Sequence, residues 1–274
     1  MAWHKRLCKH VVIKKADFAS ASSMQLHRNE VEALKNVKSV YLPHIIDFLT
    51  DSESSYTVLE YIEGESFDKL LKQRKKFSQS QLSKWLYQLT SALVAIHGQN
   101  VCHRDIKPAN IILTPHDDVC LIDFNSALVS GNNTGVISYS PAYASPEQCV
   151  YFRICDSAHK DKSVKHNQNG LHKFSSGSHN ADMVAEKETL YRPEPHNIDW
   201  KLSDIYSLGA TMYNLFIGKR PPEVLLNNPV IPRCSPDDFA IRSVIGRCMR
   251  QNPKERFPSA DDLKSNLQKY SLFG

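Results

Sequence analysis

The first sixty residues alternate short apolar runs with polar segments. Three runs rich in β-branched and aromatic residues predict strands at His10–Lys14, Ile45–Leu49 and Tyr56–Tyr61. The polar segment Thr50–Ser55 between the last two predicts a hairpin turn. Gln25–Val37 carries apolar residues at helical spacing among many charged neighbours. This part of the chain is therefore expected to be a small β-rich unit around one helix.

From residue 78 onward a helical period dominates the pattern. Ser78 and Gln81 fit a capping box, in which each side chain bonds the backbone N–H of the other residue. One apolar face follows, which predicts a long helix buried along that face. Its apolar positions are Leu82, Trp85, Leu86, Leu89, Leu93 and Ile96.

Shorter elements occupy the rest of the chain. Ile111–Leu113 and Val119–Ile122 are expected to be two strands joined by a turn. Ser203 is expected to cap a helix that Gly218 ends. Two more helices are predicted at Asp237–Arg250 and Ser259–Tyr270. The order predicts an α+β fold, with a small β-rich lobe followed by a larger α-rich lobe.

Residues 152–195 fit neither period. They are rich in Ser, His, Asn and Lys, and such a composition buries too little apolar surface to offset ordering entropy. We interpret this segment as a flexible insertion. Cys149, Cys155, His159 and His166 invite a zinc interpretation, but their spacing fits no compact ligand pair, so zinc is not favoured.

Composition narrows the class of protein. With 274 residues, 41% of them hydrophobic, the chain can bury a substantial core. No apolar run approaches the ~18 residues of a membrane-spanning helix, so no membrane segment is expected. Seven dispersed cysteines are typical of reduced thiols, which predicts a cytoplasmic protein. The net charge of +5 tolerates an anionic substrate and does not by itself indicate nucleic acid.

The chemistry-bearing pattern is the run HRDIKPAN at residues 103–110, followed by Asp123 in the sequence LIDFN. It places carboxylates, an ammonium group and an amide on two neighbouring loops. Phosphoryl transfer needs this set, because one carboxylate accepts the proton of the attacking hydroxyl, the lysine offsets phosphoryl charge, and the amide and second carboxylate hold a metal.

On these motifs the chain resembles the protein kinase family, of the bacterial Ser/Thr type, over about residues 8–150 and 199–270. The resemblance implies an enzyme that transfers the γ-phosphate of ATP, with Mg²⁺, to a Ser or Thr of a protein substrate. It implies one kinase domain over 1–274, with the N-lobe and hinge at 1–62 and the C-lobe at 63–274. It assigns Asp105 as the base, Lys107 as a phosphate-contacting lysine, and Asn110 and Asp123 as the Mg²⁺ ligands.

The same resemblance assigns nucleotide-binding residues in the small lobe. Lys14, in VVIK, would contact the α- and β-phosphates and pair with Glu30. Glu32 is the competing partner, and Glu30 is favoured because Leu34 then lies one turn later on the same face. Glu60 and Ile62 would pair with adenine through backbone groups, with Leu59 as gatekeeper.

Three further positions receive structural roles from the resemblance. Glu147, in SPE, would pair with Arg256, and Asp204 would anchor the backbone of the loop that carries Asp105. Arg104 would pair with a phosphate on the segment 123–147. Candidate phosphorylation sites are Ser130, Thr134 and Ser138, and Ser140 stands where the family has a Thr that contacts the catalytic Asp and Lys.

The sequence departs from the family pattern at three places. No glycine precedes Lys14, so the glycine-rich hairpin is missing and one strand, at Trp3–Leu7, is expected in its place. A genuine truncation and a start codon placed downstream of the real one both explain this. Asn125 replaces a glycine used where φ is positive, a conformation that Asn tolerates next best. Val12 replaces the small alanine that lies over adenine, and its extra methyl groups would tighten or crowd the adenine slot.

Two other functions stay open. The first is a pseudokinase, a binding or scaffold module with weak or no turnover, which the missing glycine-rich hairpin and Asn125 favour. The second is a small-molecule kinase, since aminoglycoside and choline phosphotransferases share the Asp, Asn and Asp arrangement. Lys107 and the SPE motif with Arg256 favour a protein substrate instead.

Overall fold

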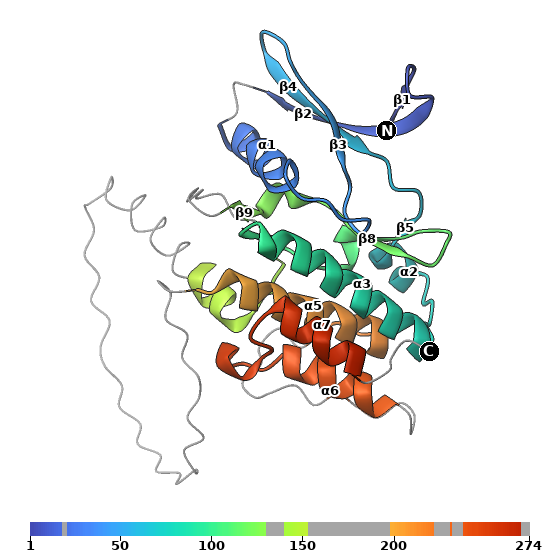
Figure 1. The fold of residues 1–274 in the computed structure, drawn as a ribbon, viewed down its shortest axis with the longest axis vertical. Coiled ribbons are helices and arrows are strands. Elements are labelled where there is room, and N and C mark those ends of the chain that lie inside the picture. The colour runs from blue at the N-terminus through green and yellow to red at the C-terminus, as the bar shows by residue number, and fades with distance from the viewer. Residues whose placement is uncertain (18–20, 130–139, 153–197, 222–230, 232–237, 270–274) are drawn as a thin grey trace, which may run out of the picture.

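A computed structural model of the chain describes residues 1–17, 21–129, 140–152, 198–221, 231 and 238–269. An antiparallel sheet occupies one end of the molecule and a group of helices the other (Figure 1). This is the α+β arrangement that the sequence predicts. The segment interpreted as an insertion, 152–195, lies outside the described residues except for its first residue.

The sheet has four antiparallel strands in the order β1-β2-β4-β3. Helix α1 (Ala21–Leu34) lies against the sheet on the side that faces the helical region (Figure 1). Both β2 and β4 extend the predicted strands at one or both ends, because their backbones pair along seven positions. The strands are β1 (Ala2–His4), β2 (Lys9–Asp17), β3 (Ile45–Thr50) and β4 (Ser54–Glu60).

The first strand differs from its prediction at Trp3–Leu7. Strand β1 covers only Ala2–His4 and pairs Trp3 with His10. Residues 5–8 form a turn, in which Cys8 has a φ of 47°. The chain must reverse here so that β1 can pair with β2, and this ends the strand three residues early.

Helix α3 (Gln79–Gly98) is the centre of the helical region and packs against both α5 (Trp200–Ile217) and α7 (Ala260–Lys269). The predicted capping box is present, with the Ser78 side chain accepting from the backbone of Gln81. Its predicted apolar face is buried, because all six positions are at most 2% exposed. The remaining helices are α2 (Phe67–Lys72), which the sequence did not predict, and α6 (Phe239–Cys248).

The N-terminal cap of α5 differs from the prediction. Asp199, not Ser203, caps this helix, and its carboxylate accepts from the backbone N–H groups of Lys201 and Leu202. Ser203 lies inside the helix, buried, with its hydroxyl 2.8 Å from that of Ser145. Gly218 ends the helix in the left-handed conformation, as predicted.

Short strands pair with one another in the loops that lie between the four-stranded sheet and the helices. Strands β5 (Glu65–Ser66), β7 (Ile111–Leu113) and β8 (Val119–Leu121) form one small sheet. Strands β6 (Val101–Cys102) and β9 (Leu128–Val129) form another. The 3₁₀ turns η1 (Pro108–Asn110) and η2 (Phe124–Ser126) follow β6 and β8, and a third, η4 (Pro253–Glu255), precedes α7. No helix among the described residues is long and apolar enough to cross a membrane.

Candidate active site

A cavity of about 510 Å³ lies between the sheet and the helical region. It is bounded above by β2 and β4 and below by the loops around η1 and η2. All six residues predicted to bind nucleotide or metal line it: Lys14, Glu30, Glu60, Ile62, Asn110 and Asp123. Val12 and Leu59 also line this cavity.

Lys14 is held between two carboxylates. Its Nζ lies 2.6 Å from Oε1 of Glu30 and 3.0 Å from Oδ1 of Asp123. Burial alone would lower the pKa of Lys14, but the charges of both carboxylates and the hydrogen bonds to them outweigh it and leave the pKa raised. Lys14 is therefore a fixed cation at neutral pH. The competing Glu32 pairs with Lys35 instead.

The loop before η1 orients the predicted base. Oδ2 of Asp105 accepts from Nζ of Lys107 at 2.6 Å and from Nδ2 of Asn110 at 3.3 Å. Lys107 also donates to the hydroxyl of Ser140 at 3.0 Å. Among the residues that the structure describes, Oδ1 of Asp105 is buried and has no hydrogen-bond partner. It is an unsatisfied acceptor, which a buried polar atom rarely is without a functional reason.

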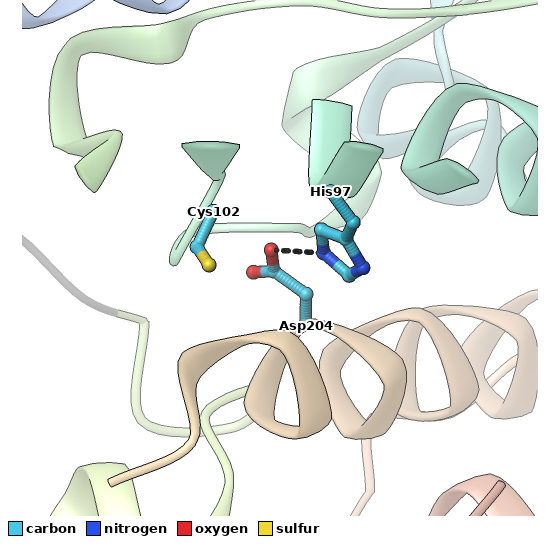
Figure 2. A group of neighbouring side chains, drawn as sticks. All are labelled: His97, Cys102 and Asp204. Carbon is cyan, nitrogen blue, oxygen red and sulfur yellow. Dashed lines mark hydrogen bonds and ion pairs between the residues drawn. The ribbon is translucent and has the colours of Figure 1, made fainter. Parts of the chain in front are cut away.

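Asp204 fixes the same loop from α5. Its carboxylate accepts from the backbone N–H groups of His103 and Arg104, each at 2.8 Å. Nε2 of His97 lies 3.0 Å from the carboxylate, and the Cys102 thiol lies nearby (Figure 2). Burial raises the pKa of Cys102, which keeps the thiol protonated at neutral pH. Because the carboxylate oxygens already accept N–H bonds, we interpret this buried cluster as an anchor for the loop rather than an ion site.

The LIDFN segment differs from expectation at Asn125. Among these residues the left-handed conformation belongs to Asp123, with φ 67° and ψ 76°, while Asn125 lies in η2 without a positive φ. Asn125 therefore does not need the tolerance that the sequence suggested. Its carbonyl accepts from Nδ2 of Asn29 on α1 at 3.4 Å. The Phe124 ring packs edge-on against His103 with centroids 4.6 Å apart.

Arg104 is buried within the protein. Its guanidinium donates to the carbonyls of Ser126 and Ala127 and lies 5.3 Å from the centroid of Trp200. Burial lowers the pKa of Arg104 to about 10, partly offset by Asp204, which leaves it cationic at neutral pH. The candidate phosphorylation sites that would pair with it lie outside the described residues. So do three of the four residues of the zinc interpretation: Cys155, His159 and His166.

Glu147 and Arg256 form a buried bidentate pair. The two contacts are 2.6 and 2.9 Å long. The remaining N–H groups of Arg256 donate to the carbonyls of Leu202, Arg250 and Gln251. The pair joins the segment after residue 140 to the end of the helical region.

Several site residues escaped the sequence analysis. His97 contacts Asp204. The only feature of the sequence that could have marked it is its place in the last turn of a buried helix. Ile112 and Ile122 line the cavity beside Asn110 and Asp123, and their positions next to the motif residues were a usable signal. Pro43 also lines it, far from any motif, and no local pattern marks it.

Comparison with known proteins shows which family the chain is similar to. The family model for the protein kinase domain matches residues 1–267. An Aurora kinase of Yarrowia lipolytica is 31% identical over 153 residues, covering 56% of this chain and 40% of that protein. A probable serine/threonine-protein kinase of Clostridium acetobutylicum is 24% identical over 280 residues, covering 95% of this chain and 36% of that protein. An Aurora kinase of Eremothecium gossypii is 24% identical over 264 residues, covering 92% and 59%.

The chain thus spans between about a third and three fifths of the length of these relatives. The match to the family model nevertheless covers both the sheet and the helices, including every residue that lines the cavity. The chain belongs to the protein kinase domain family.

Proposed function

We propose that this chain is an ATP-dependent protein kinase that phosphorylates Ser or Thr hydroxyls of a protein substrate. The observation that carries the proposal is the placement of Lys14, Asn110 and Asp123 around one cavity, with the unsatisfied Oδ1 of Asp105 on the adjoining loop. The names of similar proteins, which include serine/threonine-protein kinases, support the substrate class.

In the proposed reaction, adenine lies against Glu60 and Ile62, and Lys14 contacts the phosphates. Glu30 holds Lys14 in place through the 2.6 Å contact. Oδ1 of Asp105 accepts the proton of the substrate hydroxyl, while Lys107 offsets charge that develops on the transferred phosphoryl group. The contribution of the protein is then positioning together with electrostatic stabilisation.

The donor set fits Mg²⁺. Asn110 offers an amide oxygen and Asp123 a carboxylate, the oxygen ligands that this ion takes in phosphoryl-transfer sites, and both line the same cavity. Held by Asn110 and Asp123, the ion would supply positive charge that offsets the charge of the phosphates. The chain holds Asp123 ready for this role, because Lys14 fixes its Oδ1 at 3.0 Å.

A protein substrate and a single domain complete the proposal. Lys107 contacts Ser140, and Glu147 ties the same segment to Arg256, an arrangement that suits a protein hydroxyl better than a small alcohol. We further propose that residues 1–274 form one domain of the bacterial Ser/Thr type. Its lobes would meet near residue 62.

Transfer of labelled γ-phosphate from ATP with Mg²⁺, to the chain itself and to a generic basic protein, tests the proposal. Asp105→Asn is expected to lower the transfer rate by at least about 10²-fold, because the amide cannot accept the hydroxyl proton. The control Asp261→Asn, at an exposed site on α7, is expected to leave the rate unchanged. Labelling by Asp105→Asn at the wild-type rate, or labelling of an aminoglycoside in place of protein, would contradict the proposal.

The pseudokinase alternative is favoured by one observation: residues 1–63 contain no glycine, so they supply no glycine-rich hairpin to cover the β- and γ-phosphates. For this sequence we therefore expect weak ATP binding, with a Kd of about 100 μM or above, which is in the upper part of the 1 μM–1 mM range usual for KM values. We also expect some hydrolysis of ATP by water. Calorimetric titration and a phosphate-release assay measure both. Tight binding with no release of phosphate would be the opposite result.

A further inference from the structure

Helix α1 is fixed to the sheet by three side-chain pairs in a row. The helix residues are spaced three apart, which places them on one face. Their partners lie on β4 and β2. The pairs are Met24 with Ser55 at 3.6 Å, His27 with Thr57 at 2.8 Å, and Glu30 with Lys14 at 2.6 Å.

The middle pair is the most enclosed of the three. His27 is 5% exposed and Thr57 is fully buried, with Nε2 of His27 2.8 Å from Oγ1 of Thr57. The ring of Phe48 on β3 covers the imidazole, with centroids 5.8 Å apart. A hydrogen bond in such a place is costly to break, because neither group can turn to water.

This pair lies beside the Lys14–Glu30 contact for a geometric reason. Thr57 and Lys14 are directly opposite each other in the ladder of β2 and β4, so their side chains share one face of the sheet. His27 is one helical turn before Glu30. Any movement of His27 away from Thr57 therefore also draws Glu30 away from Lys14.

The charges around His27 oppose its protonation. Lys14 on β2 is the cation whose charge acts on His27, and the carboxylates of Glu30 on α1 and Asp123 are both paired with it. Thr57 and Phe48 carry no charge, and the segment 124–129, which also packs against α1, has no ionisable side chain. Burial, and then the charge of Lys14, lower the pKa of His27. The docked helix therefore holds the neutral imidazole, and its stability falls as the pH drops below the ordinary histidine value of about 6.5.

We propose that His27 is a positioning residue, whose neutral imidazole holds α1 on the sheet through Thr57 and so sets Glu30 against Lys14. On the acidic side, protonation of His27 releases α1 and weakens the binding of nucleotide phosphates. The second half of this statement rests on the proposed function, while the first half concerns the docking of α1 alone.

Hydrogen exchange of the α1 amides tests the docking without requiring catalysis. Wild type at pH 5.5 is expected to show at least about fivefold less protection than at pH 7.5, after correction for the intrinsic exchange rate. His27→Gln keeps a polar group near the position of Nε2 but cannot become charged, and its protection is expected to be the same at both pH values. His27→Ala and Thr57→Val each remove the hydrogen bond and are expected to lose protection at both.

Affinity for the β,γ-imido analogue of ATP with Mg²⁺ tests the link to the site. The affinity of wild type is expected to fall about fivefold or more between pH 7.5 and 5.5, and that of His27→Gln less than twofold. Two other histidine variants serve as controls. His116→Gln changes an exposed histidine. His44→Gln changes the histidine that lies 2.8 Å from Glu60, so it tests whether that histidine causes the fall. Both are expected to retain the wild-type fall.

Three results would overturn the inference. The first is equal protection of α1 in wild type and His27→Gln at pH 5.5. The second is an acidic fall in affinity that His44→Gln removes and His27→Gln keeps. The third is a His27 pKa, measured by the NMR shift of its ring, at or above about 6.5. If wild type does not bind the analogue at all, the proposed function fails, and the exchange and NMR data still decide the role of His27.

Discussion

Replacing Lys14 by methionine is expected to lower phosphate transfer by about 10²- to 10³-fold, the usual effect of removing one fixed charge from such a site. Lys14 is the cation that joins Glu30 on α1 to Asp123 at the start of η2. Methionine has a similar length but supplies neither charge nor N–H donors. The loss should appear in initial rates of labelled phosphate transfer at saturating protein substrate.

Lys15→Met is the matched control for this experiment. Lys15 is the next residue of β2, on the opposite face of the sheet, and its 54% exposed side chain pairs with Asp17 at the surface. Exposed ion pairs of this kind contribute little, so transfer by Lys15→Met is expected within about twofold of wild type.

A second variant separates charge from folding. Lys14→Met leaves Glu30, which is 1% exposed, without its cation, and this destabilises α1 as well as the site. Lys14→Arg keeps the charge and alters the geometry of the donors, so it is expected to fold like wild type and to transfer phosphate at an intermediate rate. Transfer by Lys14→Met at more than a tenth of the wild-type rate would show that Lys14 is not part of the reaction.

Replacing Arg256 by methionine is expected to lower the free energy of unfolding by about 3–5 kcal/mol, because it leaves the buried Glu147 carboxylate without a partner. All five N–H groups of Arg256 have acceptors: two contacts to Glu147 and one each to Leu202, Arg250 and Gln251. Its guanidinium also lies 4.9 Å from the ring centroid of Tyr206. Methionine satisfies none of these acceptors.

Urea unfolding measures this loss, with Lys35→Ala as the control. Lys35, the residue after α1, forms an ion pair with Glu32 on α1, with side chains 46% and 39% exposed, and losing it is expected to cost under about 1 kcal/mol. A combined Arg256→Met and Glu147→Gln variant is expected to lose less than the sum of the single losses, since no carboxylate remains unpaired. A cost below about 1 kcal/mol for Arg256→Met would contradict the role given to the pair.

The sequence alone determined the fold class and most of the long elements of this protein. Helix α3 could be predicted because its capping residues and its apolar period lie within one stretch of chain. The run at 103–110 could be interpreted because phosphoryl transfer demands that combination of side chains. The ends of helices were predicted less well where two nearby residues could each act as the N-cap. In α5 both Asp199 and Ser203 are residue types that cap helices.

Only the tertiary structure decided which of these residues meet. Lys14 and Asp123 are 109 positions apart, and their 3.0 Å contact depends on how the sheet lies over η2. The unsatisfied oxygen of Asp105 and the burial of Arg104 likewise depend on atoms supplied by distant segments. His27 gave no signal in the sequence, because a histidine in a charged helix looks like any solvated residue until the sheet encloses it. Patterns along a chain report local periods and side-chain chemistry, whereas contacts between distant segments follow from packing, which those patterns do not encode.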